Sequence, residues 1–245
     1  MELTTVQYLV MASVTLMCGF AVNGATDEEI LQALTNSCTP QCGNGGKVDF
    51  AYAISLCESD TNRLERLIRE VAERQLATGE DLVAESAIWK LGRLGTTNSL
   101  PFLYSCVTNP LLGNAAMVSI VQLEGINSNS VDCLSEYLAI RNAKAREKID
   151  CCCSIMNMSQ TLNASVAEKR YLATSILAFG HSTNTWSRLL LDEGLMRIDP
   201  SYRHSRRRLA FIRTFESVPM NDADTNFVTN TINELVAYPE SALGD

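Results

Sequence analysis

Histidine and cysteine are the first residues to consider, because their side chains supply many of the metal ligands and nucleophiles found in proteins. The chain of 245 residues has only two histidines, His181 and His204. A multi-histidine metal site or a Ser/His/Asp triad therefore has almost nothing to be built from. We expect no resident metal and no cofactor.

The chain has nine cysteines, and loss of an N-terminal segment with Cys18 would leave eight. An even number of cysteines in an exported chain favours disulfides. Cys38 and Cys42 flank a short loop that contains Pro40, where two Cα atoms can come close. No histidine lies near enough in the sequence to complete a zinc site, and the CxxxC spacing differs from that of redox CxxC motifs. We therefore predict that Cys38 and Cys42 lie close together.

Cys151, Cys152 and Cys153 form a triplet within a helical pattern. Successive residues of a helix point about 100° apart, so neighbours in the triplet cannot bond to each other. The turn before this helix centres near Asn142, nine residues from both Cys133 and Cys151. Antiparallel helices would bring these positions level, so Cys133 is predicted to pair with Cys151 or Cys152. A buried free thiol is the alternative for each member of the triplet.

Charged side chains elsewhere are spaced for ion pairs rather than for acid/base catalysis. Glu65, Glu70 and Glu73 alternate with arginines at the i, i+3 and i, i+4 spacings of one helix, which is typical of a solvated face. The arginines are Arg63, Arg66, Arg69 and Arg74.

One basic run, residues 202–208, lies in a helical pattern that continues to Phe215. It is a candidate contact for an acidic partner or a phosphate, and a solvated helix face is the alternative. The whole chain carries 28 acidic and 20 basic side chains, and this net charge of −8 argues against a general nucleic-acid binder. The candidate partner-binding residues of this run are Arg203, Arg206, Arg207 and Arg208.

The elements expected to position these cysteines and charged residues are helices. The chain is 46% hydrophobic but only 7% aromatic, with 13 glycines and 6 prolines, a composition that favours helix. Thr26 and Glu29 form a capping box that opens one helix, and Asp60 caps another whose apolar residues recur at i, i+3, i+4 and i+7. Those apolar residues are Leu64, Leu67, Ile68 and Val71. We predict an all-α fold of roughly nine to eleven helices over residues 26–245.

The N-terminus predicts export. Residues 9–22 form an apolar run of 14 residues followed by small ones, as in a secretory signal peptide, although no basic residue precedes it. Cleavage after Gly24 or after Ala25 would suit a signal peptidase. A helix of this length rises only about 21 Å, so we expect no membrane span in the mature form. A buried N-terminal helix, a retained anchor and a lipoprotein through Cys18 are the alternatives.

Two stretches repeat at an offset of 30 residues. Residues 87–95 (AIWKLGRLG) and the polar turn after them align with residues 117–125 (MVSIVQLEG) and a similar turn. Looser copies begin at Leu172 and Leu209. Each copy is an apolar helix that ends near Gly, a turn of Thr, Asn and Ser, and a second helix, and glycine suits the left-handed residue that commonly ends a helix.

This repeated order of helix, turn and helix resembles the HEAT-repeat family over roughly residues 81–238, in particular its members with repeats of about 30 residues. The resemblance implies an α-solenoid in which residues 26–80 cap an array formed by residues 81–245. It also implies a curved surface for another macromolecule and no catalytic residues. The 55 residues between Gly125 and Gly180 depart from the pattern, so one repeat is expanded or degenerate.

We therefore expect an exported, non-catalytic protein-interaction scaffold, periplasmic or extracellular, with residues 1–25 as its signal peptide. The second helices of successive hairpins would form its binding face. The alternatives are an enzyme or accessory subunit with an active groove near His204, and a structural envelope protein. The expected contacts on the face are Tyr104, Tyr137 and Arg188, with the basic run as an edge site.

Overall fold

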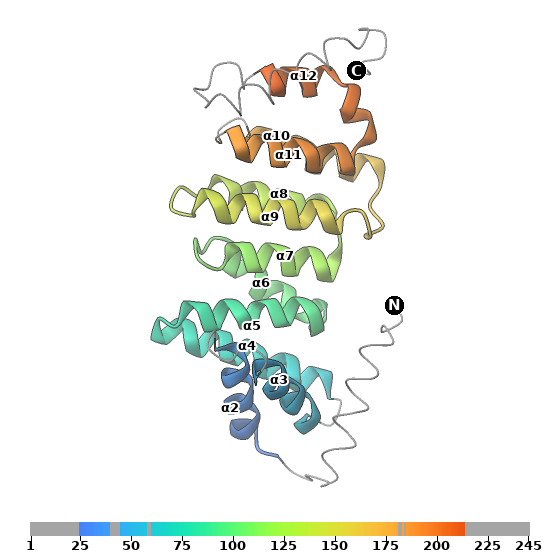
Figure 1. The fold of residues 1–245 in the computed structure, drawn as a ribbon. Helices are drawn as coiled ribbons and strands as arrows, with labels where there is room; N and C mark the ends of the chain where they lie inside the picture. Colours follow the sequence, from blue (N-terminus) through green and yellow to red (C-terminus); the bar gives the residue numbers. More distant parts are fainter. Residues whose placement is uncertain (1–24, 40–44, 58–59, 181–182, 184, 214–245) are drawn as a thin grey trace. The chain divides into compact units, whose positions relative to one another are not determined.

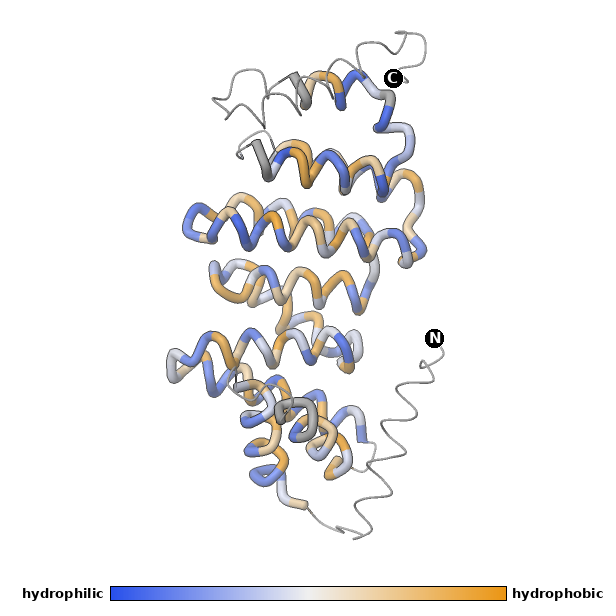
Figure 2. Tube along the Cα trace, viewed as in Figure 1, coloured by the Kyte–Doolittle hydropathy of each residue, from blue (hydrophilic) through white to orange (hydrophobic). Residues whose placement is uncertain are grey.

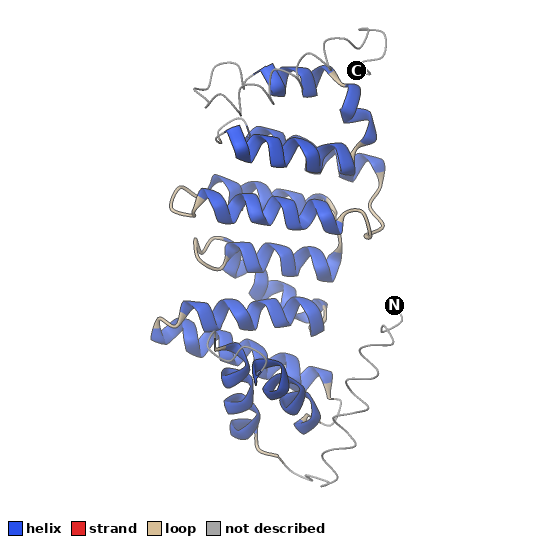
Figure 3. Cartoon of the chain, in the orientation of Figure 1, coloured by secondary structure: helices blue, strands red, loops and turns tan. Residues whose placement is uncertain are grey.

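The computed structural model describes residues 25–39, 45–57, 60–180, 183 and 185–213. Throughout these residues the secondary structure is α-helix with two short 3-10 helices, and no strand occurs among them (Figure 3). The predicted all-α class is confirmed. The chain divides into two compact units, residues 1–123 and 124–245.

The first unit is built from six α-helices and one 3-10 helix among its described residues (Figure 1). They are α2 (Asp27–Cys38), α3 (Gly45–Leu56), α4 (Thr61–Thr78), α5 (Asp81–Leu94), the 3-10 helix η2 (Thr97–Ser99), α6 (Leu100–Val107) and α7 (Gly113–Glu124). Helix α4 packs along α5, while α2 lies against α3, α4 and α5. Polar and apolar residues alternate along α4, as one-sided burial requires, whereas α7 is apolar along most of its length and is buried on most sides (Figure 2). The predicted stripe of α4 is buried, with Leu67 fully inaccessible.

Two helices of this unit begin at the predicted caps. The backbone N–H of Glu29 donates to Thr26 Oγ1 at 3.3 Å, and the N–H of Thr26 donates to the Glu29 carboxylate at 2.8 Å. This reciprocal pair is the capping box expected at the start of α2. Asp60 caps α4 by accepting from the N–H of Arg63 at 3.0 Å.

Helices α5 and α7 approach closely at Gly92. A Cβ on this glycine would lie 2.7 Å from the Cα of Ser119, too close for any larger residue without a shift of backbone. Ser119 is fully buried, and its hydroxyl donates to the carbonyl of Ile88 at 3.0 Å. The equivalent helices of the two best-matched repeats are therefore direct neighbours.

The second unit contains a further set of helices. They are α8 (Ser128–Ala139), α9 (Ala145–Met158), α10 (Val166–Gly180), α11 (Thr185–Ile198), the 3-10 helix η3 (Pro200–His204) and α12 (Arg206–Arg213). Helix α8 lies against α10, α9 against α11, and α10 against α11, while η3 contacts α11 and α12.

This pairing changes the expected binding face. As second helices of their repeats, α8 and α11 were predicted to share one row, but α8 lies beside α10 and α11 beside α9. Helix α9 occupies the long interval between Gly125 and Gly180, and within this unit it is α9 that lies beside α11.

Glycines end only some of these helices in the predicted way. Gly79 and Gly125 have left-handed backbones, with φ of 80° and 82°, which residues with a Cβ rarely adopt. Gly95 instead has an extended backbone, with φ −69° and ψ 167°. Gly180 belongs to α10, and a Cβ there would lie 2.9 Å from the ring of Phe211, so its small size serves packing.

Candidate functional site

The basic run at residues 202–208 is divided between η3 and α12. Ser205 separates the two with an extended backbone, φ −80° and ψ 149°. Its hydroxyl accepts from the N–H of Arg208 at 3.1 Å, so it caps α12. The prediction of one helical pattern through the whole run is therefore wrong at this serine.

Arg208 points into the protein rather than outward. Its Nε and Nη2 donate to the carboxylate of Asp192 on α11 at 3.0 and 2.7 Å, and each of the two side chains is 7% exposed. Tyr202 of η3, itself buried, lies beside Asp192. Burial raises the pKa of Asp192, and the hydrogen bonds from Arg208 oppose this only in part. Arg208 thus anchors α12, and its prediction as a surface contact is corrected.

A second anchor fixes α12 to α10. Phe211 is fully buried, and its ring lies against Gly180. The ion pair with α11 and this aromatic contact hold α12 from two sides. The orientation of the exposed side chains on α12 is consequently set by buried contacts.

Arg203, Arg206 and Arg207 are the exposed members of the run, and we refer to them as the arginine surface. Within the described residues none of the three has an ion pair or a side-chain hydrogen bond. Arg206 and Arg207 occupy the first turn of α12, where the helix dipole disfavours cations. Residues 124–213 carry thirteen basic and nine acidic side chains, so this part is basic within an acidic chain.

The remaining predicted contacts are less accessible. Tyr104 on α6 is half-buried, whereas Tyr137 on α8 is fully buried and Arg188 on α11 is 9% exposed. Tyr137 and Arg188 are therefore corrected from surface contacts to interior residues. The sequence held a signal for the tyrosine, because Tyr137 follows Leu134 by three residues on the apolar stripe of α8.

The cysteines of the described segments are free thiols. These are Cys38, Cys57, Cys106, Cys133, Cys151, Cys152 and Cys153. The predicted bridge from Cys133 to Cys151 or Cys152 is not formed, since all three are free thiols. Burial raises the pKa of both Cys151 and Cys152, which keeps the thiols protonated and poorly reactive. The Cys38–Cys42 prediction lies outside the described residues, since Cys42 does.

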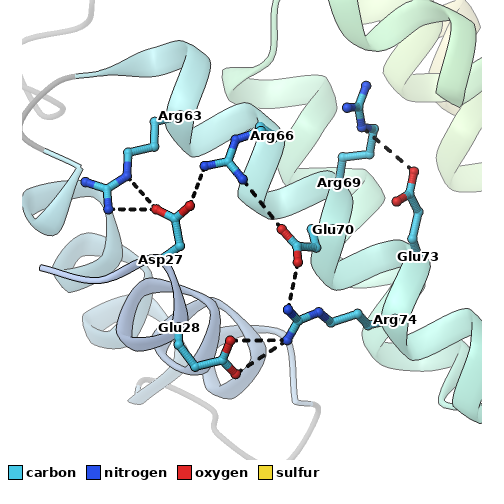
Figure 4. Close-up of polar contacts among 8 residues, drawn as sticks. All are labelled: Asp27, Glu28, Arg63, Arg66, Arg69, Glu70, Glu73 and Arg74. Atoms are coloured by element: carbon cyan, nitrogen blue, oxygen red, sulfur yellow. Dashed lines mark hydrogen bonds and ion pairs between the residues drawn. The ribbon is translucent and has the colours of Figure 1, made fainter.

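A second charged surface joins α2 to α4 in the first unit (Figure 4). One continuous chain of contacts runs through Glu28, Arg74, Glu70, Arg66, Asp27 and Arg63. Asp27 accepts from Arg63 Nε at 2.8 Å and from Arg66 Nη2 at 2.5 Å, and these hydrogen bonds lower the pKa of its carboxyl. The predicted i, i+4 pairs are confirmed for Arg66 with Glu70 and for Arg69 with Glu73. Because its arginines already bind carboxylates, this surface differs from the arginine surface.

Glu65 does not belong to that chain, contrary to the prediction. It is 7% exposed and accepts from the N–H and the hydroxyl of Thr96, at 3.1 and 2.9 Å, and from the hydroxyl of Ser99. A carboxylate of α4 therefore fixes the chain at the start of η2. Its place beside Leu64 on the buried side of α4 was the signal that sequence reasoning missed.

The described residues contain neither a metal-binding cluster nor a helix that could span a membrane. No group of three or more His, Cys, Asp and Glu side chains in these segments could hold a metal ion. No helix among them has the length and apolar character needed to cross a bilayer. His181, the side chain of His204 and residues 1–24 of the predicted signal segment lie outside the described part.

Comparison with known proteins gives no relative for this chain. No protein-family model, curated protein or solved structure is significantly similar to it.

Proposed function

We propose that this chain is an exported, non-catalytic protein-interaction scaffold with HEAT-like helical repeats, and that it binds an acidic partner protein through the arginine surface. The observation that carries the proposal is the exposure of Arg203, Arg206 and Arg207 without carboxylate partners among the described residues. The chain as a whole has a net charge of −8, so a cluster of unpaired cations is unusual in it. Guanidinium groups bind carboxylates through paired hydrogen bonds, which suits an acidic polypeptide.

The local energetics support the same proposal. Arg206 and Arg207 lie at the N-terminal end of α12, where the helix dipole makes a cation unfavourable. Carboxylates from a partner would stabilise this end of the helix. A binding role would account for arginines at this unfavourable position. The buried contacts of Arg208 and Phe211 hold α12 in place, so that a partner meets a preorganised surface.

The scaffold part of the proposal draws on the repeats and on the N-terminal segment. Equivalent helices of two repeats, α5 and α7, are neighbours, as stacking of HEAT-like units would require. The apolar run at residues 9–22 supports export to the periplasm or the extracellular space.

The test is binding of fluorescent poly-L-glutamate, a model acidic polypeptide, to the full chain at low salt. We expect Arg206→Glu combined with Arg207→Glu to weaken binding by about tenfold or more, because the contacts become repulsive. The matched control is Arg141→Glu combined with Arg146→Glu, which changes the net charge equally at two other exposed arginines of the same unit. We expect the control to change affinity less than about twofold.

Two outcomes would contradict the proposal. Equal losses in the two double variants would mean that only the net charge of the chain matters. Binding of inorganic polyphosphate without binding of polyglutamate would mean that the arginine surface recognises phosphate rather than an acidic protein.

A further inference from the structure

We draw no further inference here: the strongest candidate, the buried polar cluster of Asp192, Tyr202 and Arg208 between α11, η3 and α12, belongs to the site already described, because its ion pair is the contact that anchors α12 and the arginines which that helix carries.

Discussion

Each unit of this protein holds one helix to another with aspartate and arginine, but in opposite surroundings. In the first unit, Asp27 binds Arg63 and Arg66 at the surface, where the aspartate side chain is 43% exposed. In the second, Asp192 binds Arg208 with both side chains 7% exposed. The arginines lower the pKa of Asp27, whereas burial raises the pKa of Asp192 despite a bidentate arginine.

The difference shows that surroundings, rather than partner identity, decide what an ion pair contributes. A solvated pair keeps most of its hydration, so its formation and its loss both have small effects. A buried pair has lost the hydration of both charges, and removal of one partner leaves the other charge without compensation. The buried pair therefore adds little net stability, but the loss of one of its two partners strongly destabilises the fold.

The largest expected effect follows from substitution of Arg208. Arg208→Met should reduce the free energy of unfolding by about 3–5 kcal/mol, because it leaves the Asp192 carboxylate buried without its partner. Urea denaturation measures this loss. The double variant Arg208→Met, Asp192→Leu removes both charges and should recover most of the stability. If the double variant is as unstable as the single one, packing rather than charge dominates this site.

The next effect concerns Glu65, a buried carboxylate whose partners are neutral. Glu65→Ala should destabilise the protein by about 2–3 kcal/mol, since the N–H and hydroxyl of Thr96 and the hydroxyl of Ser99 lose their acceptor. The control is Glu73→Ala on the exposed side of the same helix, which should change stability by less than about 0.5 kcal/mol. Similar losses in both variants would refute the distinction between buried and exposed carboxylates on α4.

A smaller effect is the opposite pH dependence of the two aspartates. Because the pKa of Asp27 is lowered from 3.8, its contribution is present above pH 3.8 and is lost as the pH falls through its folded value. Because the pKa of Asp192 is raised from 3.8, stability declines as the pH increases from 3.8 through its folded value. Carboxyl-detected NMR titration should find Asp27 titrating at a lower pH than Asp192. The reverse order would contradict the comparison on which this prediction rests.

The smallest effect is expected for the exposed network. Arg66→Met should lower Tm by about 2 °C or less, and the difference should vanish in 1 M NaCl because solvated pairs are screened. Calorimetry at low and high salt measures both values. A large, salt-independent shift would show that this network behaves like the buried pair.

Local sequence determined the helices and several of their ends. The capping box of Thr26 with Glu29, the cap at Asp60 and the apolar stripe of α4 all depend on residues within a few positions of one another. Hydrogen bonds and burial on this scale recur at fixed spacings, so they can be recognised without knowledge of the rest of the chain. The same holds for the pairs of Arg66 with Glu70 and of Arg69 with Glu73.

Only the tertiary structure decided which arginines of residues 206–208 are candidates for binding a partner. Arg206, Arg207 and Arg208 are identical in type and adjacent in sequence, yet only the last meets a carboxylate of α11. Likewise, residue spacing predicted a bridge from Cys133 to Cys151 or Cys152, yet all three are free thiols. The physical reason is that burial and pairing depend on which distant helix covers a given face, and the spacing of residues along one helix carries no information about that partner.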